Sequence, residues 1–216
     1  MLYEKPDSSM KIAAQALELS QQLKWQKGIA LSYRQKGLVY YFQSDFVNAI
    51  EFSQEALKAA AVLNNNLLNA SIYNNIANVY ADMGQPEKAL DYYERLLTAA
   101  KEAKNNVYEM NALVNMGLVY LDQNNLPPAL TNLQKGLDIA VAENNISISA
   151  TIYNNMGIAY KKMNRLPEAL QHLQKSVALA KQSNNQNALA TSLNEVAKLY
   201  LAKNDYKKAQ QYATES

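Results

Sequence analysis

Two similar stretches of the chain, identical at five of nine positions, hold side chains that suit binding chemistry. The stretch IYNNIANVY covers residues 72–80 and returns as IYNNMGIAY at residues 152–160, each time with two adjacent asparagines. A carboxamide offers N–H donors and an acceptor oxygen without charge, so it can pair with a peptide backbone. Asparagine is a mediocre helix former because its side chain competes for backbone hydrogen bonds. The two pairs therefore lower helix stability, and we expect a binding or packing role that offsets this loss.

Catalytic chemistry finds little support in the residue types. His172 is the only histidine, and it belongs to an expected second helix. No imidazole therefore stands beside a serine of the first helices to activate it as a nucleophile. Glu51 and Glu55 are four residues apart on one expected helix face, which is typical of a solvated surface. The chain has no cysteine, its metal-ligating residues lack a useful spacing, and its six glycines form no phosphate-binding loop. We expect no enzyme activity, no metal and no cofactor.

Composition narrows the class of partner. The 216 residues are 49% hydrophobic and 19% charged, which describes a soluble chain with a substantial core. A net charge of +2 with scattered basic residues argues against nucleic acid. No stretch reaches the roughly 18 consecutive apolar residues of a membrane span. We expect a cytoplasmic protein without a membrane partner; a periplasmic sensor region is the alternative.

The elements that carry these side chains repeat with a fixed step of 40 residues. A small residue stands three positions before each tyrosine of the series, as Ala77 stands before Tyr80. Such self-similarity indicates a repeat architecture. The residues in register are Tyr40, Tyr80, Tyr120, Tyr160 and Tyr200, with Ala49, Ala89, Ala129, Ala169 and Ala209.

Each repeat unit contains two helical patterns. Prolines such as Pro86 fall where the second helix should begin, since proline is tolerated in the first turn of a helix. The end of the first helix carries a residue that suits a left-handed backbone, and asparagine clusters follow the second helix. The left-handed candidates are Gly84, Asn124, Asn164 and Asn204. The pattern predicts a repeated helical hairpin.

A helical wheel separates the apolar residues from the amides. With Tyr73 at 0°, Ile76, Ala77 and Tyr80 lie within about 60° and form one stripe that we expect to be core. The neighbouring asparagines fall at about 100° to 200° and point to another surface. Three amides also stand in register from repeat to repeat, preceded by Gln35 and followed by Glu195: Asn75, Asn115 and Asn155.

The spacing of Tyr73, Ala77, Tyr80 and Ala89 resembles the tetratricopeptide repeat. The usual period of that family is about 34 residues, and the step of 40 is similar to its longer-helix variety. The resemblance covers the whole chain, 1–216. It implies an all-α, right-handed superhelix, a solenoid of stacked antiparallel helical hairpins.

The repeat frame predicts how the chain is divided. Pro6 aligns with Pro86 and Ser216 aligns with Ser176 in mid-helix, so we expect a piece of a longer array, from a larger bacterial regulatory or signalling protein. The predicted parts are the second helix of a truncated repeat at 6–27, four repeats at 28–67, 68–107, 108–147 and 148–187, and a truncated repeat at 188–216.

The resemblance implies that the first helices line a concave groove that binds a peptide segment of a partner protein. The matching inner positions are Arg34, Gln35, Asn74, Asn75, Asn78, Asn115, Asn154, Asn155, Asn194 and Lys198. Asp82, Asp122 and Lys162 are in register as well and would turn the groove from acidic to basic. The alternative is that the amides bond between neighbouring helices and that the charges are solvated helix ends.

Other functions remain open at this stage. In some relatives a carboxylate clamp holds a peptide C-terminus, but the matching set (Asn74, Asn78, Asn115, Thr151 and Asn155) contains no cation. We therefore predict a non-catalytic interaction scaffold that binds a peptide. The alternatives are end-to-end self-association through uncapped ends and a small-molecule sensor domain.

Overall fold

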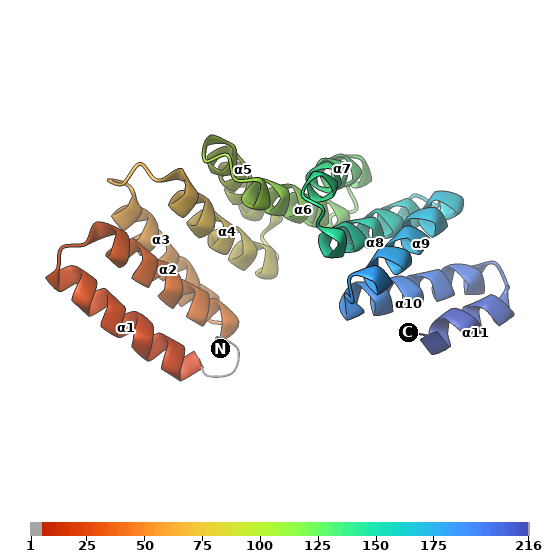
Figure 1. The fold of residues 1–216 in the computed structure, drawn as a ribbon, viewed down its shortest axis with the longest axis horizontal. Coiled ribbons are helices and arrows are strands. Elements are labelled where there is room, and N and C mark those ends of the chain that lie inside the picture. Colours follow the sequence, from red (N-terminus) through yellow and green to blue (C-terminus); the bar gives the residue numbers. More distant parts are fainter. Residues whose placement is uncertain (1–5, 216) are drawn as a thin grey trace. The chain divides into compact units, whose positions relative to one another are not determined.

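Consecutive α-helices form all of the chain that this computed structural model describes, residues 6–215. Neighbouring helices run antiparallel and are joined by tight turns (Figure 1). No strand occurs in the described range, so the predicted all-α class is confirmed. The eleven described helices are α1 (Pro6–Gln22), α2 (Gln26–Phe42), α3 (Phe46–Ala60), α4 (Asn66–Asp82), α5 (Pro86–Glu102), α6 (Asn106–Asp122), α7 (Leu126–Ala142), α8 (Ile146–Lys162), α9 (Leu166–Gln182), α10 (Gln186–Ala202) and α11 (Tyr206–Glu215).

A residue with left-handed backbone closes every turn and recurs every 20 positions. After α4 the N–H of Gly84 donates to the carbonyl of Ala81, and the N–H of Gln85 donates to that of Tyr80 at 2.9 Å. This pair of bonds is a Schellman motif. The left-handed residues are Lys24, Ser44, Asn64, Gly84, Lys104, Asn124, Asn144, Asn164, Asn184 and Asn204. The four predicted left-handed positions are confirmed, and the 40-residue repeat consists of two similar 20-residue steps.

The asparagine clusters both end one helix and begin the next. Asn64 has a left-handed backbone, and the side-chain oxygen of Asn65 accepts from the N–H of Leu68 at 2.9 Å. Such N-caps satisfy a donor that the helix leaves unpaired. Asn105, Asn145 and Asn185 cap α6, α8 and α10 in the same way. Asparagine suits both neighbouring positions, which explains why it occurs there in pairs.

The chain divides into two compact units. The N-terminal unit ends at Ala112, and the C-terminal unit begins at Leu113. In the N-terminal unit the fully buried Ile72 and Ile76 pack with alanines of α2 and α3. In the C-terminal unit Leu173 packs with Val196. The predicted division into individual repeats stays a prediction, and Ser216 lies outside the described residues.

The small residue of each first helix permits close approach of the second helix. A Cβ added to Gly37 would lie 3.0 Å from the carbonyl oxygen of Ala49 and 2.7 Å from the hydroxyl of Ser53. A Cβ added to Gly157 would lie 2.6 Å from Cγ of Leu173. Because these separations are below normal van der Waals contact, neither of these two hairpins has room for a Cβ at its glycine unless the second helix or its side chains shift.

The tyrosines that we expected in the core lie at its edge. Ile76 and Ala77 are fully buried, whereas Tyr73 and Tyr80 are half-buried and flank the ring of Tyr92 with centroid distances of 6.2 and 5.6 Å. The corresponding position of α9 is occupied by a histidine. His172 lies between two tyrosine rings of α8, 5.8 and 4.7 Å away. The only histidine of the sequence therefore takes part in aromatic packing.

Candidate functional site

The predicted groove residues of the N-terminal unit lie on α2 and α4. These two helices contact one another, and Arg34 and Asn74 occupy equivalent positions 40 residues apart. Gln35 and Asn75 follow them in the same register. These four side chains are half-buried, as is Asn78, and Asp82 at the end of α4 is exposed. These predicted residues therefore lie at equivalent positions of two first helices that contact one another.

Two of these residues have partners inside the unit. The side-chain oxygen of Asn78 accepts a hydrogen bond from the hydroxyl of Tyr93 at 2.7 Å. The carboxylate of Asp82 accepts one from the hydroxyl of Tyr41 at 2.6 Å, which links the ends of α2 and α4. Both contacts stabilise the scaffold, as the alternative interpretation of the amides expects.

Two other predicted groove residues have hydrogen-bond donors without a partner in the part of the chain that the structure describes. Nδ2 of Asn75 and Nε of Arg34 are buried and have no hydrogen-bond partner among the described residues. A buried donor without a partner destabilises a fold by about 1–3 kcal/mol. The first-helix face of the N-terminal unit therefore holds unsatisfied hydrogen-bonding capacity.

A pocket of about 330 Å³ opens next to Arg34. Leu31 and Ser71 line it, one helical turn before Arg34 and Asn74 respectively, so it lies on the same face. Its lining combines two cations with apolar side chains and contains no carboxylate. We call it the basic pocket; its lining residues are Lys27, Leu31, Arg34, Asn65, Leu67, Leu68, Ser71, Asn105 and Tyr108.

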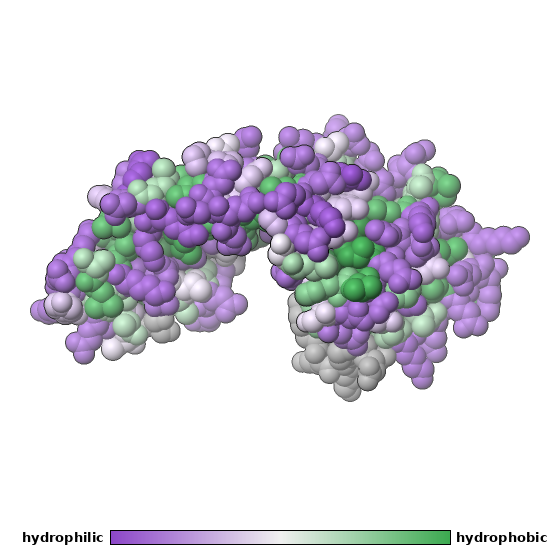
Figure 2. Space-filling view, turned by 180° about the vertical axis from the view of Figure 1, so that it is seen from behind, coloured by the Kyte–Doolittle hydropathy of each residue, from purple (hydrophilic) through white to green (hydrophobic). Residues whose placement is uncertain are grey.

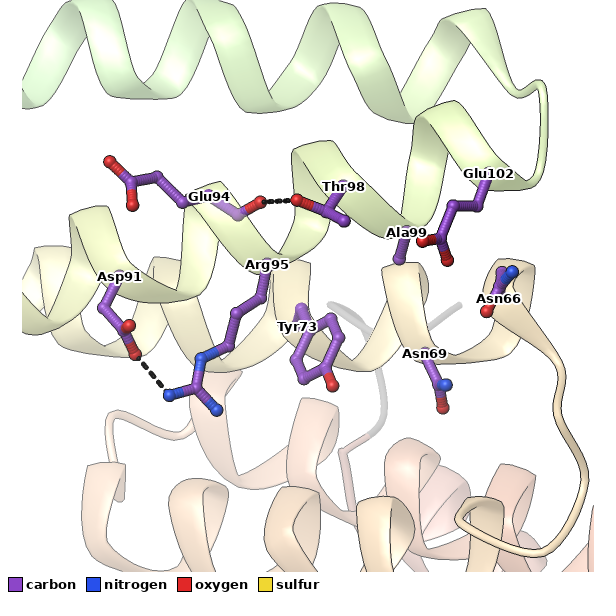
Figure 3. Close-up of a pocket in the computed structure, with 9 residues that line it drawn as sticks. All are labelled: Asn66, Asn69, Tyr73, Asp91, Glu94, Arg95, Thr98, Ala99 and Glu102. Atoms are coloured by element: carbon purple, nitrogen blue, oxygen red, sulfur yellow. Dashed lines mark hydrogen bonds and ion pairs between the residues drawn. The ribbon is translucent and has the colours of Figure 1, made fainter.

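A second pocket, of about 470 Å³, lies between α4 and α5 (Figure 3). Its cation, Arg95, forms an ion pair with Asp91 at 3.0 Å, which leaves the carboxylates of Glu94 and Glu102 in excess. We call it the acidic pocket; its lining residues are Asn66, Asn69, Tyr73, Asp91, Glu94, Arg95, Thr98, Ala99 and Glu102. The repeat frame did not indicate either pocket, because most of their lining residues lie outside the predicted inner positions.

The equivalent amides of the C-terminal unit are used internally. Asn154 and Asn155 are buried, with exposed fractions of 7% and 9%. The side-chain oxygen of Asn154 accepts from the hydroxyl of Ser192 at 3.0 Å, and that hydroxyl lies 2.7 Å from the hydroxyl of Ser176. Ser176 donates in turn to the carbonyl of Ala150 at 2.7 Å. The bond to Asn154 ties α10 to α8, and the bond to Ala150 ties α9 to α8.

The charged candidates of the C-terminal unit also have internal partners. Lys162 donates to the backbone carbonyl of Leu121 at 2.9 Å. Lys161 and Lys198 both form ion pairs with Glu195, the latter at 2.7 Å. Burial raises the pKa of the Glu195 carboxyl, but hydrogen bonds from the two lysines outweigh burial and hold the pKa below its usual value.

The remaining candidates of this unit differ in exposure. Asn115 is half-buried, whereas Asp122, Asn194 and Lys198 are exposed. Over the described range, no cluster of three or more acidic, histidine or cysteine side chains could hold a metal ion. Among the helices described, none is both long and apolar enough to cross a membrane.

The chain belongs to the tetratricopeptide repeat family. The model of that family matches residues 28–102, 68–140 and 148–216, which together cover most of the chain. The resemblance inferred from the tyrosine and alanine spacing is thereby confirmed. No curated protein sequence matches the chain.

Solved structures with low sequence identity share the fold. BtubC from P. vanneervenii has a TM-score of 0.82 at 18% identity, over 97% of this chain and 89% of BtubC. A signal transduction ATPase with numerous domains and a tetratricopeptide repeat sensor, from Pyrococcus horikoshii, has a TM-score of 0.82 at 16% identity, over 97% of this chain and 35% of its own. A Rap protein complexed with Competence and Sporulation Factor has a TM-score of 0.71 at 18% identity, over 87% and 52%.

Proposed function

We propose that this chain is a non-catalytic protein-interaction module that binds a peptide segment of a partner protein on the first-helix face of its N-terminal unit. The fold is commonly an interaction scaffold, which supports the general class. The observation that carries the proposal is the unused donor capacity of Arg34 and Asn75 beside the basic pocket. An extended peptide presents a carbonyl oxygen at every residue and can satisfy such donors.

The structural neighbours support a regulatory role by analogy. The Rap protein that resembles this chain was solved with Competence and Sporulation Factor, and the repeats of the Pyrococcus protein are described as a sensor. We propose that this chain likewise serves a larger bacterial signalling protein, in the cytoplasm and without nucleic acid. The packing of His172 between two tyrosine rings supports the absence of catalysis.

We extend the proposal to the C-terminal unit only for side chains that remain exposed. Asn194 and Lys198 are exposed on α10 and offer a donor and a cation to a peptide, although Lys198 is also paired with Glu195. Asn154 and Lys162 have internal partners, so we give them a structural role first.

A displayed library of 12-residue peptides tests the proposal. The parent chain should retain a defined set of peptides, and the double variant Asn74→Ala/Asn75→Ala should lose them while its melting temperature changes little. The matched control is Gln171→Ala/Gln174→Ala, two exposed amides of the second helix α9 that take no part in the proposal, and it should retain the set. Retention of the same peptides by all three proteins would exclude binding at the amides of the N-terminal unit.

Self-association is a second candidate because α1 exposes apolar side chains. Ile12 and Leu19 of α1 and Leu23, which directly follows this helix, are 63%, 56% and 65% exposed. Hydrophilic residues predominate on the face seen in Figure 2, with hydrophobic areas between them. A mass that rises with concentration in sedimentation would favour association, and Ile12→Lys/Leu19→Lys should then abolish the rise.

A small-molecule sensor is a third candidate, favoured by the volume of the acidic pocket. Its 470 Å³ falls within the range of ligand sites, but its lining is mostly polar, whereas such sites are mainly apolar. A rise in melting temperature with small cationic metabolites, and none with peptides, would favour this function over peptide binding.

A further inference from the structure

We propose that the basic pocket selects an acidic side chain of the bound segment, with an apolar residue of the same segment beside it. This inference rests on the proposed peptide-binding function and names the kind of partner. The pocket combines the cations Lys27 and Arg34 with an apolar wall, and none of the described side chains lining it is acidic. The ligand that complements such a lining is a carboxylate next to a hydrocarbon group.

Arg34 is the residue that makes the site selective. No ion pair to Arg34 or Lys27 forms within residues 6–215, and Nε of Arg34 is buried without a partner. A guanidinium presents its N–H groups in a planar fork that matches a carboxylate in two parallel hydrogen bonds. A carboxylate from the partner would neutralise the charge of the guanidinium through the part of Arg34 that lines the pocket, which a neutral amide does less well.

The apolar wall of the pocket favours an apolar residue close to the acidic residue of the bound segment. Leu31, Leu68 and Tyr108 line the pocket together with Leu67, which is 47% exposed. In an extended peptide the side chains at positions i and i+2 point to the same side. When an acidic residue of the peptide contacts Arg34, the peptide side chain two positions away therefore lies against these leucines. An apolar side chain at that position buries hydrocarbon surface that water would otherwise contact.

The acidic pocket of the same unit does not suit an acidic segment. Glu94 and Glu102 lie on α5 with carboxylates in excess of the paired Arg95, so this surface repels an acidic segment. The two pockets thus give the N-terminal unit one place where a carboxylate is favoured and one where it is disfavoured. That contrast supplies a matched control within a single unit.

Fluorescence anisotropy with four labelled 12-residue peptides tests the inference. The peptides carry Glu or Gln at the centre and Leu or Ser two positions later, in an otherwise constant sequence. We expect the Glu/Leu peptide to bind the parent chain about tenfold or more tightly than the Gln/Leu peptide at low salt, with a smaller difference at high salt because exposed charges are screened. Replacing Leu by Ser should weaken binding several-fold.

Variants distinguish this inference from the proposed function. Arg34→Gln should remove the preference for Glu over Gln, and Lys27→Gln, at an exposed position where folding is not at risk, should reduce it. Glu94→Gln/Glu102→Gln should leave it unchanged. Equal binding of all four peptides, lost in Asn74→Ala/Asn75→Ala, would overturn the selectivity but retain peptide binding. Binding of no peptide would overturn both proposals.

Discussion

The helices α4 and α8 share the stretch Ile-Tyr-Asn-Asn at equivalent positions and use its amides differently. Asn154 of α8 is buried and accepts a hydrogen bond from Ser192, which lies 38 residues further along the chain. The residue 38 positions after Asn74 of α4 is Ala112, which offers no hydroxyl, and Asn74 stays half-buried. The role of the amide is therefore decided by a residue in the next repeat and not by the motif itself.

Other polar side chains on the first helices also differ between the two units in whether they have partners. In the C-terminal unit Lys161 of α8 and Lys198 of α10 both form ion pairs with Glu195. In the N-terminal unit Arg34 has no carboxylate partner among the described residues, and the amide nitrogen of Asn75 has no acceptor. A face that satisfies its own polar groups gains stability, whereas a face with unused donors retains capacity for a ligand. We therefore expect stability effects in one unit and binding effects in the other.

Removal of the two equivalent amides should give the largest difference. Asn154→Ala removes the acceptor of the buried Ser192 hydroxyl and creates a small cavity, so we expect a loss of about 2–3 kcal/mol in the free energy of unfolding. Asn74→Ala should cost no more than about 0.5 kcal/mol, as is usual away from buried networks. Chemical unfolding followed by circular dichroism measures both. Equal losses would contradict the comparison.

The exchange of one residue should give Asn74 of the N-terminal unit the kind of internal hydrogen bond that Asn154 has in the C-terminal unit. Ala112→Ser supplies the hydroxyl that Asn74 lacks, and one new hydrogen bond is worth about 1 kcal/mol of unfolding free energy, less the strain of adding an oxygen at a fully buried site. We expect a net change within about 1 kcal/mol and peptide binding weakened several-fold, because Asn74 becomes occupied.

The reverse exchange is the control for that result. Ser192→Ala should lower the free energy of unfolding by about 1–2 kcal/mol, because Asn154 then loses its donor in a buried site. Calorimetry of the parent and both variants, together with anisotropy for the peptide, gives the complete comparison. Unchanged binding in Ala112→Ser would show that Asn74 takes no part in the peptide contact.

Local chemistry explains which parts of this structure the sequence predicts. The turns are set by neighbouring residues, so the step of 40 and the left-handed backbone of residues such as Gly84 follow from residue types alone. The buried bond between Asn154 and Ser192 joins residues 38 apart and depends on how two first helices pack. The basic pocket combines Lys27 with Tyr108 across three helices, which no single motif encodes. Tertiary packing, and not the repeat signal, therefore decides which of the amides are available.

The smallest expected effect concerns pH. The register of Gln35, Asn75, Asn115 and Asn155 ends in Glu195, the one member that titrates. Its folded-state pKa is lowered, because the hydrogen bonds from Lys161 and Lys198 outweigh the effect of burial, which raises it. The carboxylate therefore adds stability above its unfolded pKa, near 4.5, and this contribution is lost as pH falls through the folded value.

Replacing Glu195 by Gln should thus reduce the free energy of unfolding at pH 7 by about 1 kcal/mol or less, and the difference from the parent should disappear at acid pH. Gln35→Glu is the matched change in the N-terminal unit. It has no pair of lysines to accept the charge, so it should gain no such pH dependence. Unfolding curves between pH 3 and pH 7 decide the point. A difference that persists at pH 3 would assign Glu195 a packing role and would leave the two faces distinguished by hydrogen bonds alone.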